Sequence, residues 1–451
     1  MCSACGRESL RWEGRCPACG EWNAMEEVAG PRATRRERAR GPAARPSRLA
    51  ESGREAPSRR PTNLGELDLV LGGGLVPGSV VLLGGPPGVG KSTLLLQLAA
   101  RVAQQGARAL YVSGEESAEQ VWSRAARLGG AAGETFFLAE TGVERIIAAA
   151  AELQPDLLCV DSVQTLQLAQ LDSGPGTVAQ VRGGAGALQA FAKDSGIPTF
   201  LIGHVTKGGG LAGPSTLAHL VDVVVRFDGT RSGEHRILRA IKNRFGSVGE
   251  VAVFRMTEAG LEPVGDAGTA FLANRRPGAC GSAVSAPMEG SRPLLAEIQA
   301  LTISSRYPTP QRRTTGFPIR RLSMLLAVLE RRAGIGMGTS DVFVNVAGGL
   351  RLLDPAADLA VLAALISAEL DRPLREAAFV GEVGLGGEVR EVLGLERRLR
   401  EIRRGGLRSA VLPSASQAPS GLAVQVVERV SDLVDLVREG HGEMNAAAAR
   451  A

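Results

Sequence analysis

The stretch SVVLLGGPPGVGKSTLLLQLAARVAQQG, residues 79–106, decides the fold of this chain. The apolar run at 79–85 predicts a buried strand, and the periodicity over 92–106 predicts a helix. Between them lies Gly85-x4-Gly90-Lys91-Ser92, a phosphate-binding loop in the strand–loop–helix context that such loops require. Its glycines let backbone N–H groups turn toward a phosphate, and the helix N-terminus adds its dipole. The stretch therefore predicts a nucleotide-binding α/β fold.

The loop also predicts its ligands. Lys91 is expected to reach the β- and γ-phosphates of ATP, and Ser92 is expected to ligate Mg²⁺. The plain alternative, a glycine-rich turn that binds nothing, would not need the lysine. We therefore expect ATP and Mg²⁺ to be held by Gly85, Pro86, Pro87, Gly88, Val89, Gly90, Lys91, Ser92, Thr93 and Asp161.

From about residue 61, short apolar runs alternate with helix-like stretches. Further strands are expected at 107–114, 156–162, 198–204 and 221–227. Buried strands that alternate with helices favour a mostly parallel sheet covered on both faces. HRILRAIKN and EVAVFRM, later in the chain, resemble strands added at one edge.

Polar residues stand at the ends of three of these strands, where ligands of α/β sheets bind. Asp161 is the carboxylate expected to hold Mg²⁺. Glu115 could polarise an attacking water, which would make hydrolysis possible. The alternative for Glu115 is an acid near the start of a helix that begins at about Ser117. His204 could sense the γ-phosphate, although a lone histidine is more often a plain surface residue.

The N-terminus holds two CxxC pairs, Cys2-x-x-Cys5 and Cys16-x-x-Cys19. Two such pairs can complete a tetrahedral sulfur cage, so Cys2, Cys5, Cys16 and Cys19 are expected to bind Zn²⁺. About thirty residues cannot build an apolar core alone, which makes a metal the expected organiser. Disulfides or idle thiols are the alternatives, and a reduced compartment disfavours the first. Cys159 and Cys280 are interpreted as structural.

Composition bounds the class of protein. The chain has 451 residues, 44% hydrophobic and 22% charged, with a net charge of +5. These values are typical of a folded protein of two or three domains. No apolar run approaches a membrane span and no secretory signal is visible, so a cytoplasmic location without membrane contact is expected. The mild positive charge is compatible with a polyanionic partner without establishing one.

Changes in composition and periodicity along the sequence divide the chain into segments. Residues 1–28 form the expected zinc finger, and 29–60, rich in Arg, Ala, Pro and Gly, form a basic flexible linker. Residues 61–264 are the nucleotide-binding domain. Residues 265–440 form a second α/β domain, with helices at 320–334 and 356–370 and strands at 341–349 and 409–414; a frayed tail, 441–451, follows.

Lysine is scarce. Among 52 Lys and Arg residues, only Lys91, Lys193, Lys207 and Lys242 are lysines. Lys242 lies in KNRFG, residues 242–246, on an expected edge strand and turn, where alternation places Lys242 and Arg244 on one face. A solvated β-turn is the plain alternative for this motif. No role is assigned to Lys193.

Taken together, these residues carry a family resemblance. The loop, Glu115 and Asp161 resemble a RecA-like ATPase core. CSACGRESLRWEGRCPACGEWN, GGPPGVGKST, GHVTKGG and KNRFG, in this order over nearly the whole chain, are similar to the bacterial RadA (Sms) family of DNA repair and recombination ATPases. KNRFG is the most family-specific of these strings.

The resemblance implies a homo-hexameric ring that binds single-stranded and branched DNA, hydrolyses ATP and works beside the RecA recombinase. It gives Glu115 the position of the catalytic base and His204 that of the sensor. Lys207, Gly208, Gly209 and Gly210 fall in a DNA-binding loop, for which a plain glycine-rich connection is the alternative. Lys242 and Arg244 would act on the γ-phosphate of the neighbouring subunit.

The C-terminal region resembles the Lon protease fold. The nucleophilic serine of that family falls on about Ala356 and its lysine on about Val389, and no lysine follows Lys242. A Ser–Lys peptidase is therefore excluded as chemistry. The arginines of RRLREIRRGG suit a DNA contact or an ordinary solvated helix face.

The sequence thus predicts a DNA-dependent ATPase of recombinational repair, linked to DNA damage and stress response, that drives branch migration as a helicase-like ring. The alternative is a nucleotide-gated adaptor or scaffold without motor activity. Stimulation of ATP turnover by single-stranded DNA separates the two.

Overall fold

The computed structural model describes residues 2, 14–22, 58–130, 133–204, 215–230, 234–265, 268, 270–272, 275–415 and 418–439. The chain divides into two compact units, Met1–Ala56 and Pro57–Ala451. Among the expected features, Cys5, Lys207–Gly210 and the tail at 441–451 lie outside the described residues, as does most of the linker at 29–60.

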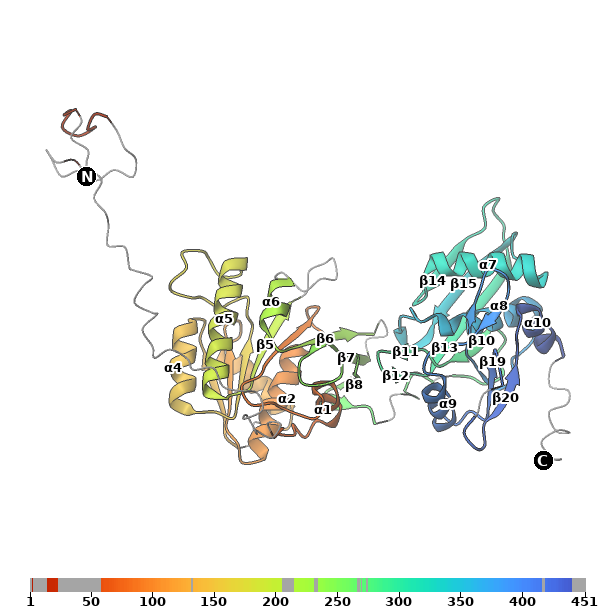
Figure 1. Ribbon diagram of the computed structural model, residues 1–451, viewed down its shortest axis with the longest axis horizontal. Helices are drawn as coiled ribbons and strands as arrows, with labels where there is room; N and C mark the ends of the chain where they lie inside the picture. The colour runs from red at the N-terminus through yellow and green to blue at the C-terminus, as the bar shows by residue number, and fades with distance from the viewer. Residues whose placement is uncertain are drawn as a thin grey trace, which may run out of the picture. The chain divides into compact units, whose positions relative to one another are not determined.

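A nine-stranded sheet organises the first half of the larger unit (Figure 1). Its spatial order is β3-β2-β4-β5-β1-β6-β7-β8-β9. The strands from β3 to β6 pair in parallel, and β6 to β9 pair antiparallel. Their bounds are β1 (Val80–Gly85), β2 (Ala109–Ser113), β3 (Thr135–Ala139), β4 (Leu157–Asp161), β5 (Thr199–His204), β6 (Val223–Gly229), β7 (His235–Asn243), β8 (Val251–Thr257) and β9 (Gly260–Pro263).

Helices cover both faces of this sheet, because its buried strands are apolar on both sides. On one face, Leu67 and Leu95 pack with Leu83 and Phe200. On the other, Ile146 and Leu188 belong to the cluster around Leu82. The helices are α1 (Gly65–Leu71), α2 (Lys91–Gln104) and α3 (Ala118–Arg127) on the first face, and α4 (Val143–Leu153), α5 (Val178–Ser195) and α6 (Ser215–Leu220) on the second.

A seven-stranded sheet, ordered β14-β15-β13-β10-β16-β19-β20, organises the C-terminal part (Figure 1). Its strands are β10 (Ser282–Ser285), β13 (Ala296–Ser304), β14 (Arg312–Thr315), β15 (Ser340–Val346), β16 (Ala378–Phe379), β19 (Ser409–Leu412) and β20 (Ala423–Val426). Two small hairpins are β11 (Met288–Glu289) with β12 (Arg292–Pro293), and β17 (Glu382–Val383) with β18 (Val389–Arg390). The helices are α7 (Ile319–Ala333), α8 (Asp358–Leu370), α9 (Leu395–Arg404) and α10 (Val430–Glu439).

Helix α8 forms the centre of this second part. Every residue from Asp358 to Ser367 is buried, as expected for a helix that is apolar around its whole circumference. The one charge in this span, Asp358, is 0% exposed. It accepts hydrogen bonds from Arg321 and from the backbone N–H of Val383, which compensate its burial.

The predicted α/β architecture is confirmed, including each of the five strands expected around the nucleotide site. One detail is wrong. The strand that carries Lys242 is not at the edge of the sheet, because β7 lies between β6 and β8. The pairing of β7 with β8 runs only from His235 to Arg239, however, so the end that bears Lys242 pairs with β6 alone among the described strands.

In the C-terminal part, the two positions that the resemblance to the Lon protease fold assigns to a serine and a lysine carry buried apolar side chains. Ala356 is 0% exposed and Val389 is 8% exposed. Gly381 brings them together, since its N–H donates to the carbonyl of Ala356 and its α-carbon lies against the Val389 side chain. Neither residue can supply a nucleophile or a base.

In the smaller unit, residues 14–22 form a tight turn. A β-bridge joins Arg15 and Trp22, and the N–H of Cys16 donates to the carbonyl of Glu21 at 2.9 Å. Gly20 has φ of 76°, a conformation that favours glycine. Within the described residues of both units, the helices lack the length and apolarity that a membrane crossing requires.

Candidate nucleotide and metal sites

The phosphate-binding loop connects the end of β1 to the start of α2. Gly88 and Gly90 have φ of 74° and 110°, which ordinary side chains rarely adopt. A Cβ on Gly85 would lie 2.3 Å from the carbonyl oxygen of Phe227 in β6. The loop therefore needs its glycines both for its turns and for its packing against the next strand.

Lys91 closes the loop on itself. Its Nζ donates hydrogen bonds of 3.0 Å to the carbonyls of Gly85 and Pro86. Burial lowers the pKa of Lys91, while the negative charges of Asp161 and Glu115 act in the opposite direction. The charges of Asp161 and Glu115 thus act on Lys91, and the assignment of the three groups to one nucleotide site stays a prediction.

Asp161 ends β4 next to the loop. Its carboxylate accepts a 2.7 Å hydrogen bond from the hydroxyl of Tyr111, which is buried in the neighbouring strand β2. Burial raises the pKa of Asp161, and hydrogen bonds from Ser92 and Tyr111 counteract that rise. Ser92 and Asp161 are thus in contact, as two ligands of one Mg²⁺ would need to be. Sequence reasoning missed Tyr111, and no motif marks it.

Glu115 and Glu116 follow β2 and have different surroundings. Glu116 forms a bidentate pair with Arg124 of α3. Glu115 accepts a hydrogen bond from the Ser162 hydroxyl, directly after Asp161. The two acids therefore have different partners: Glu116 pairs with a side chain of α3, whereas Glu115 contacts the residue that follows β4.

Glu115 also lies near the start of the next helix, α3, which was its alternative interpretation. Helix α3 has Ser117 as its N-cap, with a reciprocal capping box to Gln120. Glu115 lies before the cap and takes no part in it. Its hydrogen bond to Ser162 and its effect on Lys91 favour a place in the nucleotide site instead.

His204 ends β5, where its backbone pairs with Gly85 in the parallel register of β1 and β5. The residue therefore stands at the same edge of the sheet as the phosphate-binding loop. The expected DNA-binding residues, Lys207–Gly210, lie in the following stretch, outside the described residues. That stretch leads directly into α6.

Lys242 and Arg244 lie on the far side of β6 from β1, around the end of α6. Lys242 donates hydrogen bonds of 2.7 Å to the carbonyls of Ala218 and Val221. Burial lowers the pKa of Lys242, the charge of Arg244 adds to this effect, and Asp222 opposes it. Arg244 pairs with Asp222 at 3.1 Å.

Asn243, between them, explains part of the KNRFG motif. Its side-chain amide donates to the carbonyls of Val70 and Leu71 at the end of α1, at 3.4 and 3.2 Å. Its side-chain oxygen accepts from the N–H of Phe245 at 2.9 Å. Asn243 therefore fixes the turn to α1, while the two cations on either side of it face α6 and Asp222.

Cys2, Cys16 and Cys19 form the candidate metal site. Their sulfur atoms all lie within 4.8 Å of one another, as thiolates that share one zinc ion require. Backbone hydrogen bonds from Cys19 and Ala18 lower the pKa of Cys16 to about 6. The donor set fits Zn²⁺, and the expected fourth ligand, Cys5, lies outside the described residues.

Cys159 and Cys280 lie outside this cluster. Cys159 is buried in β4, where burial raises its pKa. Cys280 is exposed, and partial desolvation of its thiol together with a hydrogen bond to Asp371 raises its pKa. Neither thiol joins a metal cluster among the described residues.

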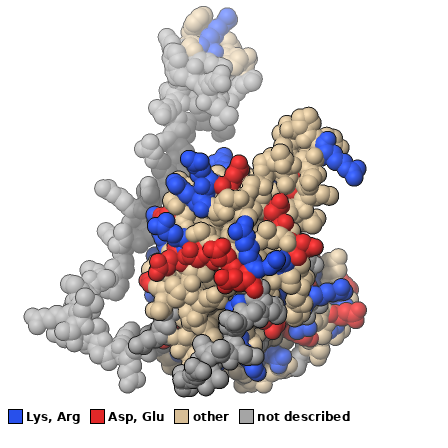
Figure 2. Space-filling view, turned by 90° about the vertical axis from the view of Figure 1, so that its right-hand side faces the viewer, with Lys and Arg blue, Asp and Glu red and all other residues tan. Residues whose placement is uncertain are grey.

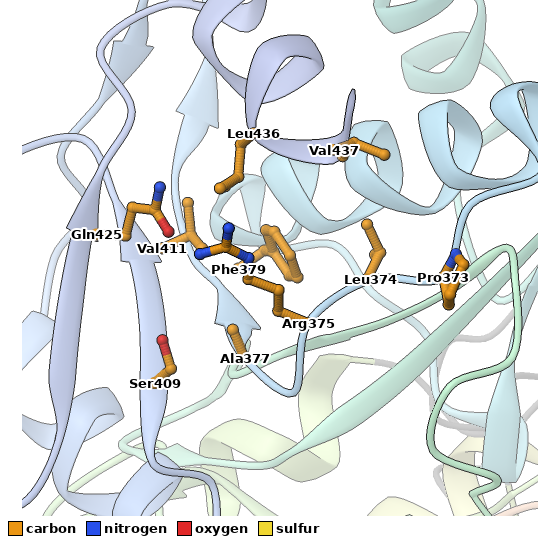
Figure 3. Close-up of a pocket in the computed structure, with 10 residues that line it drawn as sticks. All are labelled: Pro373, Leu374, Arg375, Ala377, Phe379, Ser409, Val411, Gln425, Leu436 and Val437. Carbon is orange, nitrogen blue, oxygen red and sulfur yellow. The ribbon is translucent and has the colours of Figure 1, made fainter. Parts of the chain in front are cut away.

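Two features of the C-terminal part bear on ligand binding. The pocket between β16, β19 and α10, lined by Phe379, Val411 and Leu436 among others (Figure 3), has a volume of about 10 Å³. That volume admits about one water molecule and excludes a nucleotide. On the face shown in Figure 2, the coloured basic and acidic side chains are interspersed, so they form no single-sign field there.

Comparison with known proteins assigns the family. Residues 45–210 match the AAA domain, and residues 1–27 match the rubredoxin metal binding domain. The chain is 46% identical over 445 residues to the DNA repair protein RadA of Pseudomonas aeruginosa, covering 97% of this chain and 98% of that protein. It is 45% identical over 448 residues to the RadA of Escherichia coli, with 97% of each covered. Similarity at this level over nearly the whole length of both proteins shows that the chain belongs to the DNA repair protein RadA family.

Proposed function

We propose that this protein is an ATPase stimulated by single-stranded DNA, which assembles as a hexameric ring and drives branch migration of recombination intermediates beside the RecA recombinase. The observation that carries the proposal is the convergence of Lys91, Glu115 and Asp161 at the carboxyl ends of β1, β2 and β4. Three charged groups of these types at one sheet edge suit phosphoryl transfer.

In this site each side chain has a separate task. Lys91 would leave its two carbonyl partners for the β- and γ-phosphates of ATP. Ser92 and Asp161 would hold Mg²⁺, which supplies neutralisation of the phosphate charge when bound. Glu115 would accept a proton from the attacking water, with the Ser162 hydroxyl orienting the carboxylate. His204, at the neighbouring strand end, would sense the γ-phosphate.

The proposal of a ring rests on Lys242 and Arg244. Their side chains bond to carbonyls around the end of α6 and to Asp222, and within the described part of the chain these partners lie outside the phosphate-binding loop. Their side chains are partly exposed, so they can reach a neighbouring subunit. Acting there on the γ-phosphate, they would stabilise the charge that develops during phosphoryl transfer.

DNA would bind at Lys207–Gly210, in the stretch that precedes α6. A loop that follows a nucleic-acid backbone needs cations and flexibility more than base-reading side chains. The C-terminal part would serve the ring as a scaffold and would not cleave peptides, since Ala356 and Val389 replace the two catalytic groups. The N-terminal cysteines would hold a structural zinc ion.

The first experiment measures ATP hydrolysis with and without single-stranded DNA, and movement of a branched DNA substrate. Stimulation by DNA together with branch movement is expected. If DNA leaves turnover unchanged and no branched substrate moves, the motor proposal fails and the adaptor alternative replaces it. Electron micrographs with an ATP analogue and single-stranded DNA would show whether rings form.

The second experiment tests action between subunits. A Lys242→Ala chain keeps its own nucleotide site, and a Lys91→Ala chain keeps Lys242 and Arg244, the residues proposed to act in trans. When the two inactive chains are mixed, some interfaces join an intact nucleotide site to an intact Lys242. These interfaces are expected to restore part of the ATP hydrolysis. If no mixture ratio restores it although mixed rings form, Lys242 does not act across the interface.

A further inference from the structure

Asp222 is a buried carboxylate at the junction of β1 and β6. Its side chain is 2% exposed. It accepts a 3.1 Å hydrogen bond from the N–H of Val80, and its own N–H donates to the carbonyl of Val80 at 3.0 Å. A buried charge of this kind is tolerated only where cations or donors compensate it.

Two cations from different parts of the chain meet at this single carboxylate. Lys193, in the last turn of α5, lies 3.2 Å from it. Arg244 of the KNRFG motif lies 3.1 Å from it. The cationic side chains are 48% and 53% exposed, so both are free to move on the solvent side while the carboxylate stays fixed.

The cluster therefore holds one more positive charge than its buried carboxylate requires. If Arg244 leaves to reach a neighbouring nucleotide, Asp222 keeps Lys193 and the N–H of Val80 as partners. If Lys193 were absent, the departure of Arg244 would leave a buried carboxylate without a cation in direct contact, which is unfavourable. The second cation thus makes the movement of the first one possible.

We propose that Lys193 is a positioning residue that takes over the Asp222 carboxylate when Arg244 moves into the nucleotide site of the neighbouring subunit. This inference rests on the proposed function, because it supposes that Arg244 acts in trans. It gives a role to the one lysine that the sequence left unexplained, since Lys91, Lys207 and Lys242 fall at expected phosphate contacts.

The test is a double-mutant cycle on ATP hydrolysis at saturating single-stranded DNA. Lys193→Gln is expected to reduce turnover by roughly tenfold, because Arg244 becomes the one cation of this pair left in direct contact with Asp222 and is retained there. Lys193→Arg, which keeps the charge, is expected to retain most of the turnover. Asp194→Asn, in the same exposed helical turn, serves as the matched control and is expected to behave like the wild type.

The decisive variant combines Lys193→Gln with Asp222→Asn. An asparagine still accepts from the N–H of Val80 but carries no charge to retain Arg244, so turnover is expected to return to within about threefold of the wild type. A purely structural role of Lys193 predicts the opposite, a double variant no more active than the single one. That outcome would overturn the proposal. Thermal melting of every variant, and of Asp222→Asn alone, establishes that the compared proteins are folded.

The trans action of Arg244 and the role of Lys193 can be disproved separately. The proposed trans action fails if Arg244→Ala chains regain no activity when mixed with Lys91→Ala chains in rings. The inference about Lys193 fails alone if that mixture is active but Lys193→Gln turns over ATP like the wild type.

Discussion

The hydroxyl of Tyr111 donates a 2.7 Å hydrogen bond to the carboxylate of Asp161 across the adjacent strands β2 and β4. Burial and the nearby negative charge raise the pKa of Tyr111, so the phenol remains a donor throughout the physiological range. The bond fixes one oxygen of the carboxylate that is expected to hold Mg²⁺. Tyr111 is therefore a supporting partner of the nucleotide site and not only a core residue.

Replacing Tyr111 by phenylalanine removes this donor and leaves the packing of the ring. We expect turnover at limiting Mg²⁺ to fall about tenfold, as is common for loss of an outer partner of a metal ligand. The loss removes one influence that lowers the pKa of Asp161, so the acid limb of the pH–activity profile should move to higher pH. Tyr307→Phe is the control, because the only other tyrosine is 65% exposed. An unchanged Mg²⁺ dependence would contradict the role.

The two acids after β2 should differ in their effects. Glu115→Gln is expected to lower ATP hydrolysis by about a hundredfold or more while nucleotide binding persists, because a general base is lost. Glu116→Gln should cost only a few-fold, since that side chain pairs with Arg124 outside the reacting centre. Single-turnover hydrolysis and nucleotide affinity are measured for both. Equal losses in the two variants would show that the assignment of Glu115 is wrong.

The sequence predicted the nucleotide site where its signals are local. The phosphate-binding loop and the acid at the end of β4 follow from short apolar runs and their flanking residues, and the structure has each strand there. Strand β3 was missed although its sequence TFFLA is largely apolar, and its residues are only partly buried or exposed because β3 lies at the edge of the sheet. The alternating pattern of β13 was missed for a similar reason, as its second half is largely exposed.

Contacts between distant residues could not be predicted in this way. Tyr111 meets Asp161 only because β2 and β4 are neighbours, a fact of sheet order. Lys193 and Arg244 meet at Asp222 because α5 and the end of β7 lie close to the junction of β1 and β6. No single segment of the sequence shows which residues meet in this way. The composition therefore marked the lysines as unusual but did not show that Lys193 pairs with Asp222.

The zinc site predicts a selective effect of its cysteines. Cys16→Ser should reduce bound zinc below about half an ion per chain, because it removes one of the clustered thiols. Cys280→Ser is the control, since this exposed thiol is not part of the cluster. Metal analysis of the purified proteins measures the difference. Equal zinc contents in the two variants would exclude Cys16 as a ligand.

The pair of Arg321 and Asp358 predicts how the C-terminal part responds to pH. Arg321 donates to Asp358 at 3.0 Å, and the carboxylate is 0% exposed. Burial raises the pKa of Asp358, and the Arg321 hydrogen bond lowers it. Arg321→Met should therefore reduce the free energy of unfolding by about 3 kcal/mol at pH 7, because the buried charge loses its partner.

The sign of the pH dependence follows from the raised pKa. A carboxyl group whose pKa is higher in the folded state than in the unfolded state favours folding when it is protonated. The free energy of unfolding therefore falls as pH rises from the pKa of the unfolded state to the pKa of the folded state. Without Arg321 the folded pKa of Asp358 rises further, and the variant should regain stability as pH falls from 7 toward 5. Denaturant unfolding at several pH values measures this, with the exposed neighbour variant Arg320→Met as control. If the loss of unfolding free energy in Arg321→Met stays constant with pH, its cause is lost packing and not the charge of Asp358. In that case, adding Asp358→Asn would not restore stability.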